Sequence, residues 1–513
     1  MNSSDQTSLT KRYFYKLVSN IVSLTQGLLV NSIIPRALGP ALLGTYSYLN
    51  DLSLQTFNFL EAGTSQALAT KTSQRPNDVN IIRFFILISI AIHLIAATAL
   101  LIITTTSLRN LLLDGIDGRL LIFSFICGSF TWQNNILIKM LDSLGRTAQL
   151  ERLRILNALL RMLSIVILFF TGVITIQVYF VFNILFLGLI NFNCFKILKG
   201  HYRHSDDQLT TKTLKDNFKE FFQYSSPLFT YTCVSSITVF FDRWVLQRYG
   251  GSTQQGFFSL AFQLSAVCLM FSSAMIPLFH REVARAAHIN NSQRVYELTR
   301  KTLPGLFSIA AVLGLFGAFN AKEIVTLLAG PQFALASLPL ALMFLYPIHQ
   351  TYGQIVGTIF YGMGQTRVYR NIGLTSVCLG SIISFIFIAP KELYGLNLGA
   401  LGLSLKYIVS QLISVHLFLY FSMRHLSQSM IPFVKNQLLI ILSFGSSAWA
   451  AKTIVDMWEL PHVMLKIAFS GCVYLGIISL LLYLYYKFDV QILMDDTKLH
   501  FKRIQSLKKH FNF

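Results

Sequence analysis

Long apolar segments recur along the whole chain and constrain its fold more than any other feature of the sequence. A helix needs about 20 mainly apolar residues to cross a hydrocarbon layer of about 30 Å. Fourteen segments satisfy this window: 14–34, 42–65, 83–103, 119–138, 154–174, 176–195, 221–241, 256–279, 302–320, 333–361, 371–390, 397–421, 432–451 and 466–486. The sequence therefore predicts an all-α polytopic membrane protein with about 14 transmembrane helices.

The composition excludes several other classes of protein. Hydrophobic residues make up 53% of the chain and charged residues only 12%, whereas a soluble domain has about 25% charged residues. A soluble enzyme, a nucleic-acid binder and a disordered chain are all excluded on this ground. The six cysteines are scattered through apolar segments without a CxxC pair, so we expect neither disulfides nor a metal site.

The basic residues predict the orientation of the chain in the membrane. The formal net charge is +20, and an excess of Lys and Arg marks the cytoplasmic side of a membrane. With fourteen spans, both termini share the side that carries most of these residues, so both are predicted to be cytoplasmic. The opposite loops hold few of them: Arg36, Arg109, Arg119, Arg243, Arg248, Lys322, Lys391, Lys452 and Lys466.

Residues 487–513 are predicted to form a basic cytoplasmic tail. From Leu499 onward, apolar and basic residues fall largely on opposite faces of a helix, a pattern typical of a helix lying in the lipid headgroup layer. A disordered basic tail accounts for the same residues equally well.

Two pairs of short motifs indicate an internal repeat. The pattern R-x-x-G-x-x-x-x-G-x-aromatic-S occurs from Arg36 and again from Arg248, 212 residues later. A Gly-x-Thr motif at Gly145 is repeated at Gly364, 219 residues later. The offset covers an even number of spans, which predicts a parallel repeat of two six-helix bundles. We assign the first half to 1–200, the second to 201–425 and two additional transmembrane helices to 426–486.

Polar residues form stripes on several predicted helices. Polar side chains inside a membrane face the helix bundle or a water-filled cavity, and related stripes on the first and seventh spans point to one cavity between the halves. Helix packing is the competing interpretation, and for the tenth span both stay open. The candidate cavity residues on these four spans are Lys16, Asn20, Gln26, Asn31, Gln55, Asn58, Tyr224, Tyr231, Ser235, Gln350 and Gln354.

Few ionisable residues lie inside the predicted spans, and these residues allow more specific predictions about function. A charged residue at mid-membrane costs about 2.5–3.5 kcal/mol on insertion scales, so Asp51 and Glu61 are hard to explain by packing. Together with Asp242 they are candidates for ion coupling. Arg161 and Lys406 also fall within spans. Each is a candidate for contact with substrate, with snorkelling to the headgroups as the alternative.

Catalytic alternatives lack the necessary motifs. The chain contains no HExxH, GxSxG or Walker-type GxxxxGK[ST] sequence, so neither these chemistries nor ATP-driven movement is expected of it. A polymerase or glycosyltransferase of the membrane would need a sizeable loop outside the cytoplasm, and no predicted loop on that side is long enough.

Several motifs resemble those of bacterial polysaccharide-biosynthesis flippases, the lipid-linked O-antigen-unit translocases of the MOP (multidrug/oligosaccharidyl-lipid/polysaccharide) superfamily. The first is the stretch Ile34-Pro-Arg-Ala-Leu-Gly-Pro-Ala-Leu-Leu-Gly-Thr-Tyr-Ser. The others, in order along the chain, are Phe241-Asp-Arg-Trp, Gly256-Phe-Phe-Ser-Leu-Ala, Pro277 with basic residues after it, Tyr361-Gly-Met-Gly-Gln-Thr and Gly399-Ala-Leu-Gly-Leu-Ser.

The resemblance implies a fold of two six-helix bundles that open alternately to the two sides of a bacterial inner membrane. It implies a substrate of oligosaccharide on an undecaprenyl pyrophosphate carrier, moved to the periplasmic leaflet for O-antigen or other surface polysaccharide. It implies no bound cofactor but a proton or sodium gradient, other polysaccharide-assembly proteins as partners, and no nucleic acid. Asp51 and Glu61 depart from the cationic cavity of related members. They keep open the alternative of a cation-coupled multidrug exporter of the same superfamily.

Overall fold

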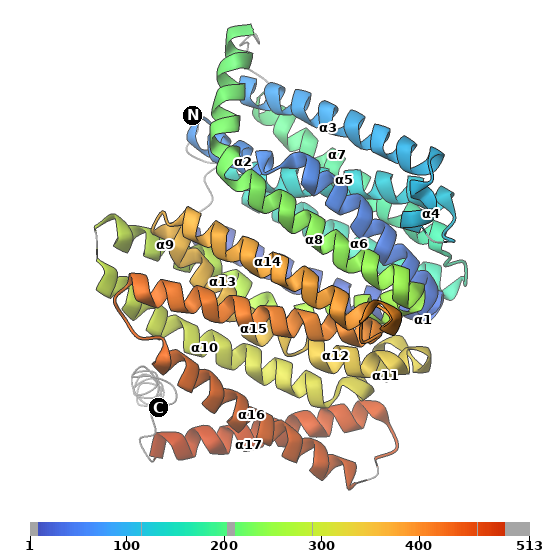
Figure 1. Ribbon diagram of the computed structural model, residues 1–513, viewed down its shortest axis with the longest axis vertical. Helices are drawn as coiled ribbons and strands as arrows, with labels where there is room; N and C mark the ends of the chain where they lie inside the picture. Colours follow the sequence, from blue (N-terminus) through green and yellow to red (C-terminus); the bar gives the residue numbers. More distant parts are fainter. Residues whose placement is uncertain (1–8, 114, 203–210, 290, 459, 488–513) are drawn as a thin grey trace, which may run out of the picture. The chain divides into compact units, whose positions relative to one another are not determined.

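A computed structural model describes residues 9–113, 115–202, 211–289, 291–458 and 460–487 of the chain, which are helical throughout with short connections (Figure 1). The predicted tail over 487–513 lies almost wholly outside these residues. The helices are α1 (Leu9–Glu61), α2 (Thr64–Gln74), α3 (Val79–Thr105), α4 (Leu108–Leu113), α5 (Gly118–Ser143), α6 (Thr147–Phe170), α7 (Ile176–His201), α8 (Thr211–Ser265), η1 (Ala266–Leu269), α9 (Met270–His288), α10 (Ser292–Phe319), α11 (Ala321–Ala329), η2 (Pro331–Ala336), α12 (Ser337–Met343), α13 (Tyr346–Gly362), α14 (Thr366–Ile388), η3 (Lys391–Leu393), α15 (Gly399–His425), α16 (Ile431–Asp456) and α17 (Val463–Lys487).

Among the residues that the structure describes, twelve helical stretches are long and apolar enough to cross a membrane, and two of them are about twice the usual length. They have 44 and 45 residues, or about 66 Å at 1.5 Å per residue, and each is broken at one non-helical glycine, Gly39 or Gly251. Counting each as two crossings gives the predicted fourteen. The sequence predicted loops at these two places. The structure has kinks instead, because a positive φ at glycine redirects the backbone within one residue.

The backbone takes the same conformation at equivalent positions of the predicted repeat. Gly39 has φ 74° and ψ 173°, and Gly251 has φ 74° and ψ 178°. At the second motif, the amide of Arg146 donates to the carbonyl oxygen of Leu141 at 2.8 Å, and that of Gln365 donates to Phe360 at 2.8 Å. The repeated residues therefore mark repeated turns.

The chain divides into two compact units, which are described separately. Unit 1 comprises Met1–Ser259 and Ser384–Gly399, and unit 2 comprises Leu260–Ile383 and Ala400–Phe513. This division follows packing, whereas the predicted halves, with their boundary at 200, follow the repeat. The packing units do not test the predicted halves, which stay a prediction.

In unit 1 the two copies of the repeated motif pack directly on one another. A Cβ atom on Gly44 would overlap the carbonyl oxygen of Ser252 and lie 2.6 Å from the amide nitrogen of Gly256. A Cβ atom on Gly256 would overlap the carbonyl oxygen of Pro40. Pro40 and Ser252 are themselves related by the 212-residue offset, so the contact is reciprocal. We call these four residues the glycine elbow.

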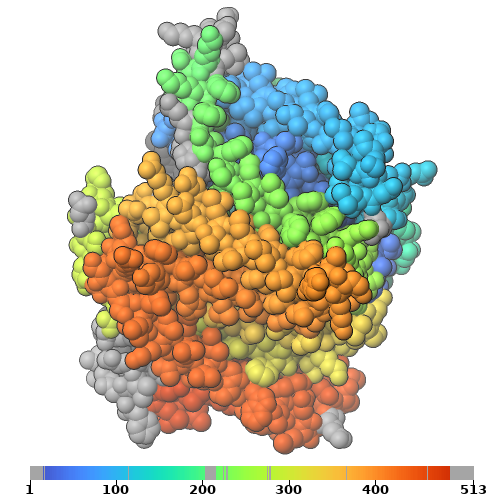
Figure 2. Space-filling model, viewed as in Figure 1, coloured from blue at the N-terminus to red at the C-terminus, as the bar shows by residue number. Residues whose placement is uncertain are grey.

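The largest fully buried side chains in the core of each unit are aromatic, and large apolar residues are also exposed on the outside. Trp132, Tyr48 and Phe180 lie in the core of unit 1, and Phe307 and Tyr352 in that of unit 2. The long α3 lies on the surface of its unit in the space-filling view (Figure 2), where Leu94 and other large apolar residues are exposed. Exposed apolar helices of this length suit a lipid environment.

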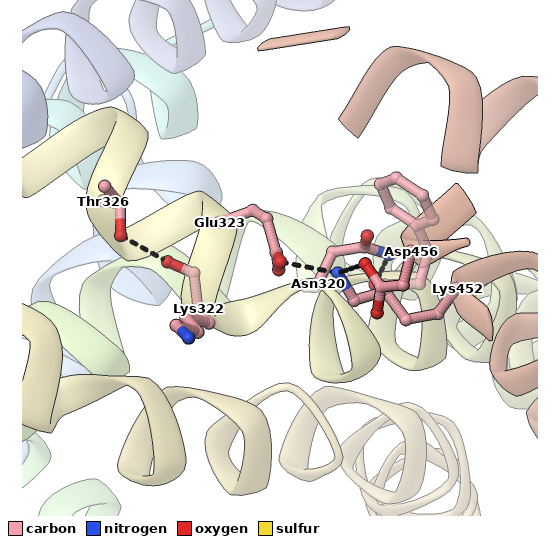
Figure 3. A network of polar contacts seen from close by, with 7 residues as sticks. Asn320, Lys322, Glu323, Thr326, Lys452 and Asp456 are labelled. Carbon is pink, nitrogen blue, oxygen red and sulfur yellow. Dashed lines mark hydrogen bonds and ion pairs between the residues drawn. The ribbon is translucent and has the colours of Figure 1, made fainter. Parts of the chain in front are cut away.

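The last two helices, which lie outside the predicted repeat, are attached to unit 2 partly through a buried charge network (Figure 3). Lys452 on α16 places its Nζ 2.5 Å from Oε1 of Glu323 on α11 and 2.8 Å from Oδ1 of Asp456. The side chains of Lys452 and Glu323 are only 17% and 13% exposed. A pair shielded to this degree contributes more than a surface ion pair.

We expect Lys452→Met to lower the free energy of unfolding by about 1–3 kcal/mol, because it leaves the buried Glu323 carboxylate without its cation. Lys435→Met is the matched control, since Lys435 is exposed on the same helix. Thermal unfolding of the purified protein in detergent measures both. Equal midpoints for the two variants would show that the network does not hold α16.

Candidate functional site

An ion pair inside unit 1 joins the part of α1 after its kink to α8. Nε of Arg243 lies 2.9 Å from Oδ2 of Asp51, with the two side chains 9% and 25% exposed. The same guanidinium donates to the side chains of Gln255 at 3.3 Å and Ser259 at 3.1 Å, and lies over the ring of Phe258. Asp51 is therefore held by a fixed cation.

The prediction that Arg243 lies in a loop is wrong. Arg243 lies in the middle of α8 and is buried. The motif Phe241-Asp-Arg-Trp, in which a cation follows an acid within an apolar segment, was the available signal. Only the fold shows that the acid facing Arg243 is Asp51.

The neighbouring Asp242 is completely enclosed in unit 1. Its carboxylate accepts a hydrogen bond from the hydroxyl of Ser384 at 2.5 Å, and both residues are at most 1% exposed. Ser235 and Tyr231 lie about two and three turns earlier on α8 and are half-buried. The side chain of Tyr224 lies outside the described part of the structure.

Glu61 ends α1 and is held by neutral donors. Its Oε2 accepts a hydrogen bond from Nε1 of Trp132 at 2.6 Å, and its Oε1 accepts one from the hydroxyl of Ser65. Lys139 reaches this group only through Ser65, to whose hydroxyl Nζ donates at 2.8 Å. Within the described residues, no cation forms an ion pair with Glu61.

A histidine lies next to this cluster. Nδ1 of His93 is 2.6 Å from the carbonyl oxygen of Ser89, which can only accept, so Nδ1 carries a proton. Nε2 then faces the hydroxyl of Ser129 at 2.7 Å and the amide of Gln133 at 3.1 Å. The His93 and Trp132 rings are 5.5 Å apart. The cluster therefore continues from Glu61 through Trp132 to a titratable imidazole.

Arg161 bridges α6 and α7. Its guanidinium donates to Oδ1 of Asn183 at 2.6 Å and lies over the rings of Phe182 and Phe186. Asn183 in turn donates to the hydroxyl of Tyr46 at 3.3 Å. Through these contacts Arg161 joins α6 to α7. The spacing of residues in the sequence does not reveal such contacts.

The polar face predicted on α1 is half-buried and largely without partners. Its members, with those on the helix after the kink, are Asn20, Gln26, Asn31, Gln55 and Asn58. None of their side chains forms a hydrogen bond with another residue that the structure describes. Lys16, at the exposed end of this face, is 3.4 Å from Asp142. Half-buried amides without protein partners are suited to bind water or the hydroxyl groups of a ligand.

The candidates in unit 2 bind one another or their neighbours. The amide of Gln411 donates to Gln350, and the hydroxyl of Ser272 donates to Gln354 at 2.8 Å. Lys406 is 7% exposed, with Nζ 4.7 Å from the centre of the Tyr407 ring. It lies beside Gly380 on α14.

These groups can bind a cation or a polar ligand. The acids of unit 1 differ in their surroundings: Asp51 is ion-paired, Asp242 is enclosed and Glu61 is held by neutral donors.

Comparison with known proteins identifies relatives of low sequence identity. The chain is 23% identical over 276 residues to the probable low-salt glycan biosynthesis flippase Agl15 of Haloferax volcanii, a match that covers 52% of this chain and 56% of that protein. It is 23% identical over 430 residues to the capsular polysaccharide biosynthesis protein CapF of Staphylococcus aureus, covering 81% of this chain and all of CapF. No known family model matches the chain.

The fold is that of solved transporters. The lipid II flippase MurJ in an inward closed conformation superposes with a TM-score of 0.68 at 13% identity, covering 93% of this chain and 99% of MurJ. An inward-facing multidrug resistance MATE family transporter of the MOP superfamily gives a TM-score of 0.58 at 15% identity, covering 80% and 94%. The predicted fold class is confirmed, and so is the resemblance to flippases of glycan and polysaccharide biosynthesis.

Proposed function

We propose that this chain, which has the fold of MOP-superfamily transporters, is a flippase for lipid-linked oligosaccharides. It takes a glycan on a polyprenyl pyrophosphate carrier from the cytoplasmic leaflet to the outer leaflet by alternating access. The full-length likeness to a lipid II flippase carries this proposal. The names of Agl15 and CapF, which refer to glycan and polysaccharide biosynthesis, support the substrate class.

The physical reason for such a protein is the cost of moving sugars through hydrocarbon. A glycan with a pyrophosphate group loses its hydration there, and each unpaired polar group costs several kcal/mol. The unpartnered amides of α1 replace water for the hydroxyl groups of the glycan, while the apolar carrier stays in the bilayer. Rocking between two open states then requires that the substrate bind the two states differently.

The orientation and location belong to the same proposal. Lys and Arg are concentrated in the predicted segments on the side of the two termini, which supports cytoplasmic termini. The proposed substrate implies other proteins of polysaccharide assembly as partners. The lipid-linked glycan must be made on one side of the membrane and used on the other side.

The decisive experiment is translocation of a labelled lipid-linked oligosaccharide in vesicles that contain only this protein. We expect protein-dependent movement of the label across the bilayer, and accumulation of the unflipped intermediate in cells without the gene. Normal surface glycan in such cells, with no accumulated intermediate, would refute the proposal.

A cation-coupled multidrug exporter is the second candidate, because the MATE fold also matches and unit 1 contains buried acids. The lower coverage counts against it. The inward-facing MATE transporter covers 80% of this chain, whereas the lipid II flippase covers 93%. Altered resistance to cationic dyes on deletion, with normal glycan, would favour the exporter.

We further propose that a proton or sodium gradient drives transport and that Glu61 exchanges the cation. Asp51 already has a fixed cation and Asp242 is enclosed, so Glu61 changes its charge with the least rearrangement.

We expect Glu61→Gln to lower transport under an imposed gradient to the rate without a gradient. Glu392→Gln, on the exposed η3, should leave the stimulation of transport by the gradient intact. Glu61, Asp51 and Asp242 can all be replaced by amides in one variant. Intact gradient-driven transport by that variant would refute coupling through these acids.

A further inference from the structure

A basic pocket lies in unit 1 where α6 begins and α7 ends, away from the acids described above. Its volume is about 520 Å³. The polar side chains that line it are Arg146, Gln149, Arg152, Asn193, Lys196 and His201. Among the residues that the structure describes, no carboxylate lines the pocket, so the side chains described there are positive or neutral.

The positive charge of the pocket is not cancelled by its own helices. Glu151 is the one acid of α6, and α7 contains none. Both oxygens of Glu151 are engaged by Arg154, at 3.0 and 3.1 Å, and its side chain is completely buried. The N-terminus of α6, with its partial positive charge, adds to the cationic side chains.

Two of the cations are held in place without an acid. Arg152 donates to the hydroxyl of Tyr15 at 3.0 Å and lies 5.0 Å from the centre of that ring. Lys196 has its Nζ 4.5 Å from the centre of the Phe192 ring. Contacts with aromatic rings orient a cation and leave its charge available to an anion.

The faces that line the pocket continue along both helices as exposed apolar strips. On α6, Leu153 in the pocket is followed by Leu156, Leu160 and Leu163, which are 55%, 40% and 60% exposed. On α7, Asn193 and Ile197 are preceded by Leu189 and Leu185, which are 44% and 64% exposed. A charged end and two apolar strips match an anionic headgroup with two acyl chains.

We propose that this pocket binds the phosphate headgroup of an anionic phospholipid, with one acyl chain along α6 and the other along α7. Basic pockets between transmembrane helices on the cytoplasmic side are suited to such headgroups. In the proposed orientation the pocket faces the cytoplasmic leaflet. Phosphatidylglycerol is the simplest probe. The lipid is a resident ligand, distinct from the single-chain carrier that the protein is proposed to move.

The test is native mass spectrometry of the purified full chain with phosphatidylglycerol, and separately with phosphatidylcholine carrying the same chains. We expect phosphatidylglycerol to bind at least tenfold more tightly. Each Lys or Arg near a membrane surface is worth about fivefold in affinity, so Lys196→Gln should weaken binding about fivefold and Arg152→Gln/Lys196→Gln about 25-fold. Lys199→Gln is the matched control, since Lys199 is exposed on the same helix outside the pocket. Lys196→Arg should bind as the parent does.

Each opposite outcome overturns the assignment. Equal affinity for the two lipids, or no loss in the double variant when its elution profile is that of the parent, shows that the pocket holds no anionic headgroup. Displacement by equimolar inorganic phosphate shows a site for a free anion. Displacement by undecaprenyl pyrophosphate at lower concentration assigns the pocket to the carrier instead. Because no transport is measured, these outcomes are independent of the proposed function.

Discussion

Gly44→Ala and Gly256→Ala are each expected to lower the free energy of unfolding by about 3 kcal/mol, at the upper end of the usual range for overpacking. The added methyl group meets main-chain atoms of the other copy of the motif, which no rotamer change can move. Either the α1 and α8 segments separate or their helices distort, and both responses also remove neighbouring contacts. One such contact is the hydrogen bond of 3.1 Å between the hydroxyls of Thr45 and Ser252.

Gly27→Ala provides the control for this prediction. Gly27 is also in α1, but a Cβ atom there would meet nothing within 4 Å, and alanine is a better helix former than glycine by about 1 kcal/mol. Thermal unfolding in detergent should place Gly27→Ala at or above the parent midpoint and the two elbow variants well below it. Midpoints of Gly44→Ala and Gly256→Ala close to the parent would contradict the packing described for the glycine elbow.

Arg243→Met is expected to lower the free energy of unfolding by about 2–3 kcal/mol. Breaking a fully buried ion pair by removing one partner costs about 3–5 kcal/mol, and we expect less here because the Asp51 side chain is 25% exposed. The substitution also removes the hydrogen bonds to Gln255 and Ser259. Arg119→Met, an exposed arginine of α5, should change the midpoint little.

Two further variants separate charge from shape at this pair. Arg243→Lys keeps the cation but not the planar fork of donors, so it should recover only part of the stability. Asp51→Leu combined with Arg243→Met removes the unpaired carboxylate, and its loss should be smaller than the sum of the two single losses. Additive losses would show that the two residues do not interact energetically.

The transmembrane helices could be predicted from the sequence because hydrophobic length is a local property. Fourteen segments were expected, and the described helices account for fourteen crossings when the two kinked helices are counted twice. The kinks at Gly39 and Gly251 were visible only as repeated motifs. Pro35 and Pro40 lie within α1 on either side of the first of them.

The partners of the candidate residues could not be predicted in the same way. Periodicity identifies the face of a helix but not the helix that it meets. Glu61 accepts a hydrogen bond from Trp132, which lies 71 residues further along the chain. Arg161 donates a hydrogen bond to Asn183 on the next helix. The sequence predicted Glu61 as a candidate for ion coupling and Arg161 as a candidate for contact with substrate. It identified no partner residue for either. Arg243 was missed because a cation close to a predicted span end is indistinguishable from a loop residue.

The glycine elbow also has a consequence for the order in which the protein forms. Its two glycines are separated by 212 residues, and neither copy of the motif contains the surface that the other needs. At about 5–20 residues per second, the ribosome takes roughly 10 to 40 seconds to make this stretch. During that time the first helices stay in the bilayer with the backbone around Gly44 uncovered, so the elbow is a late, post-insertion step of assembly.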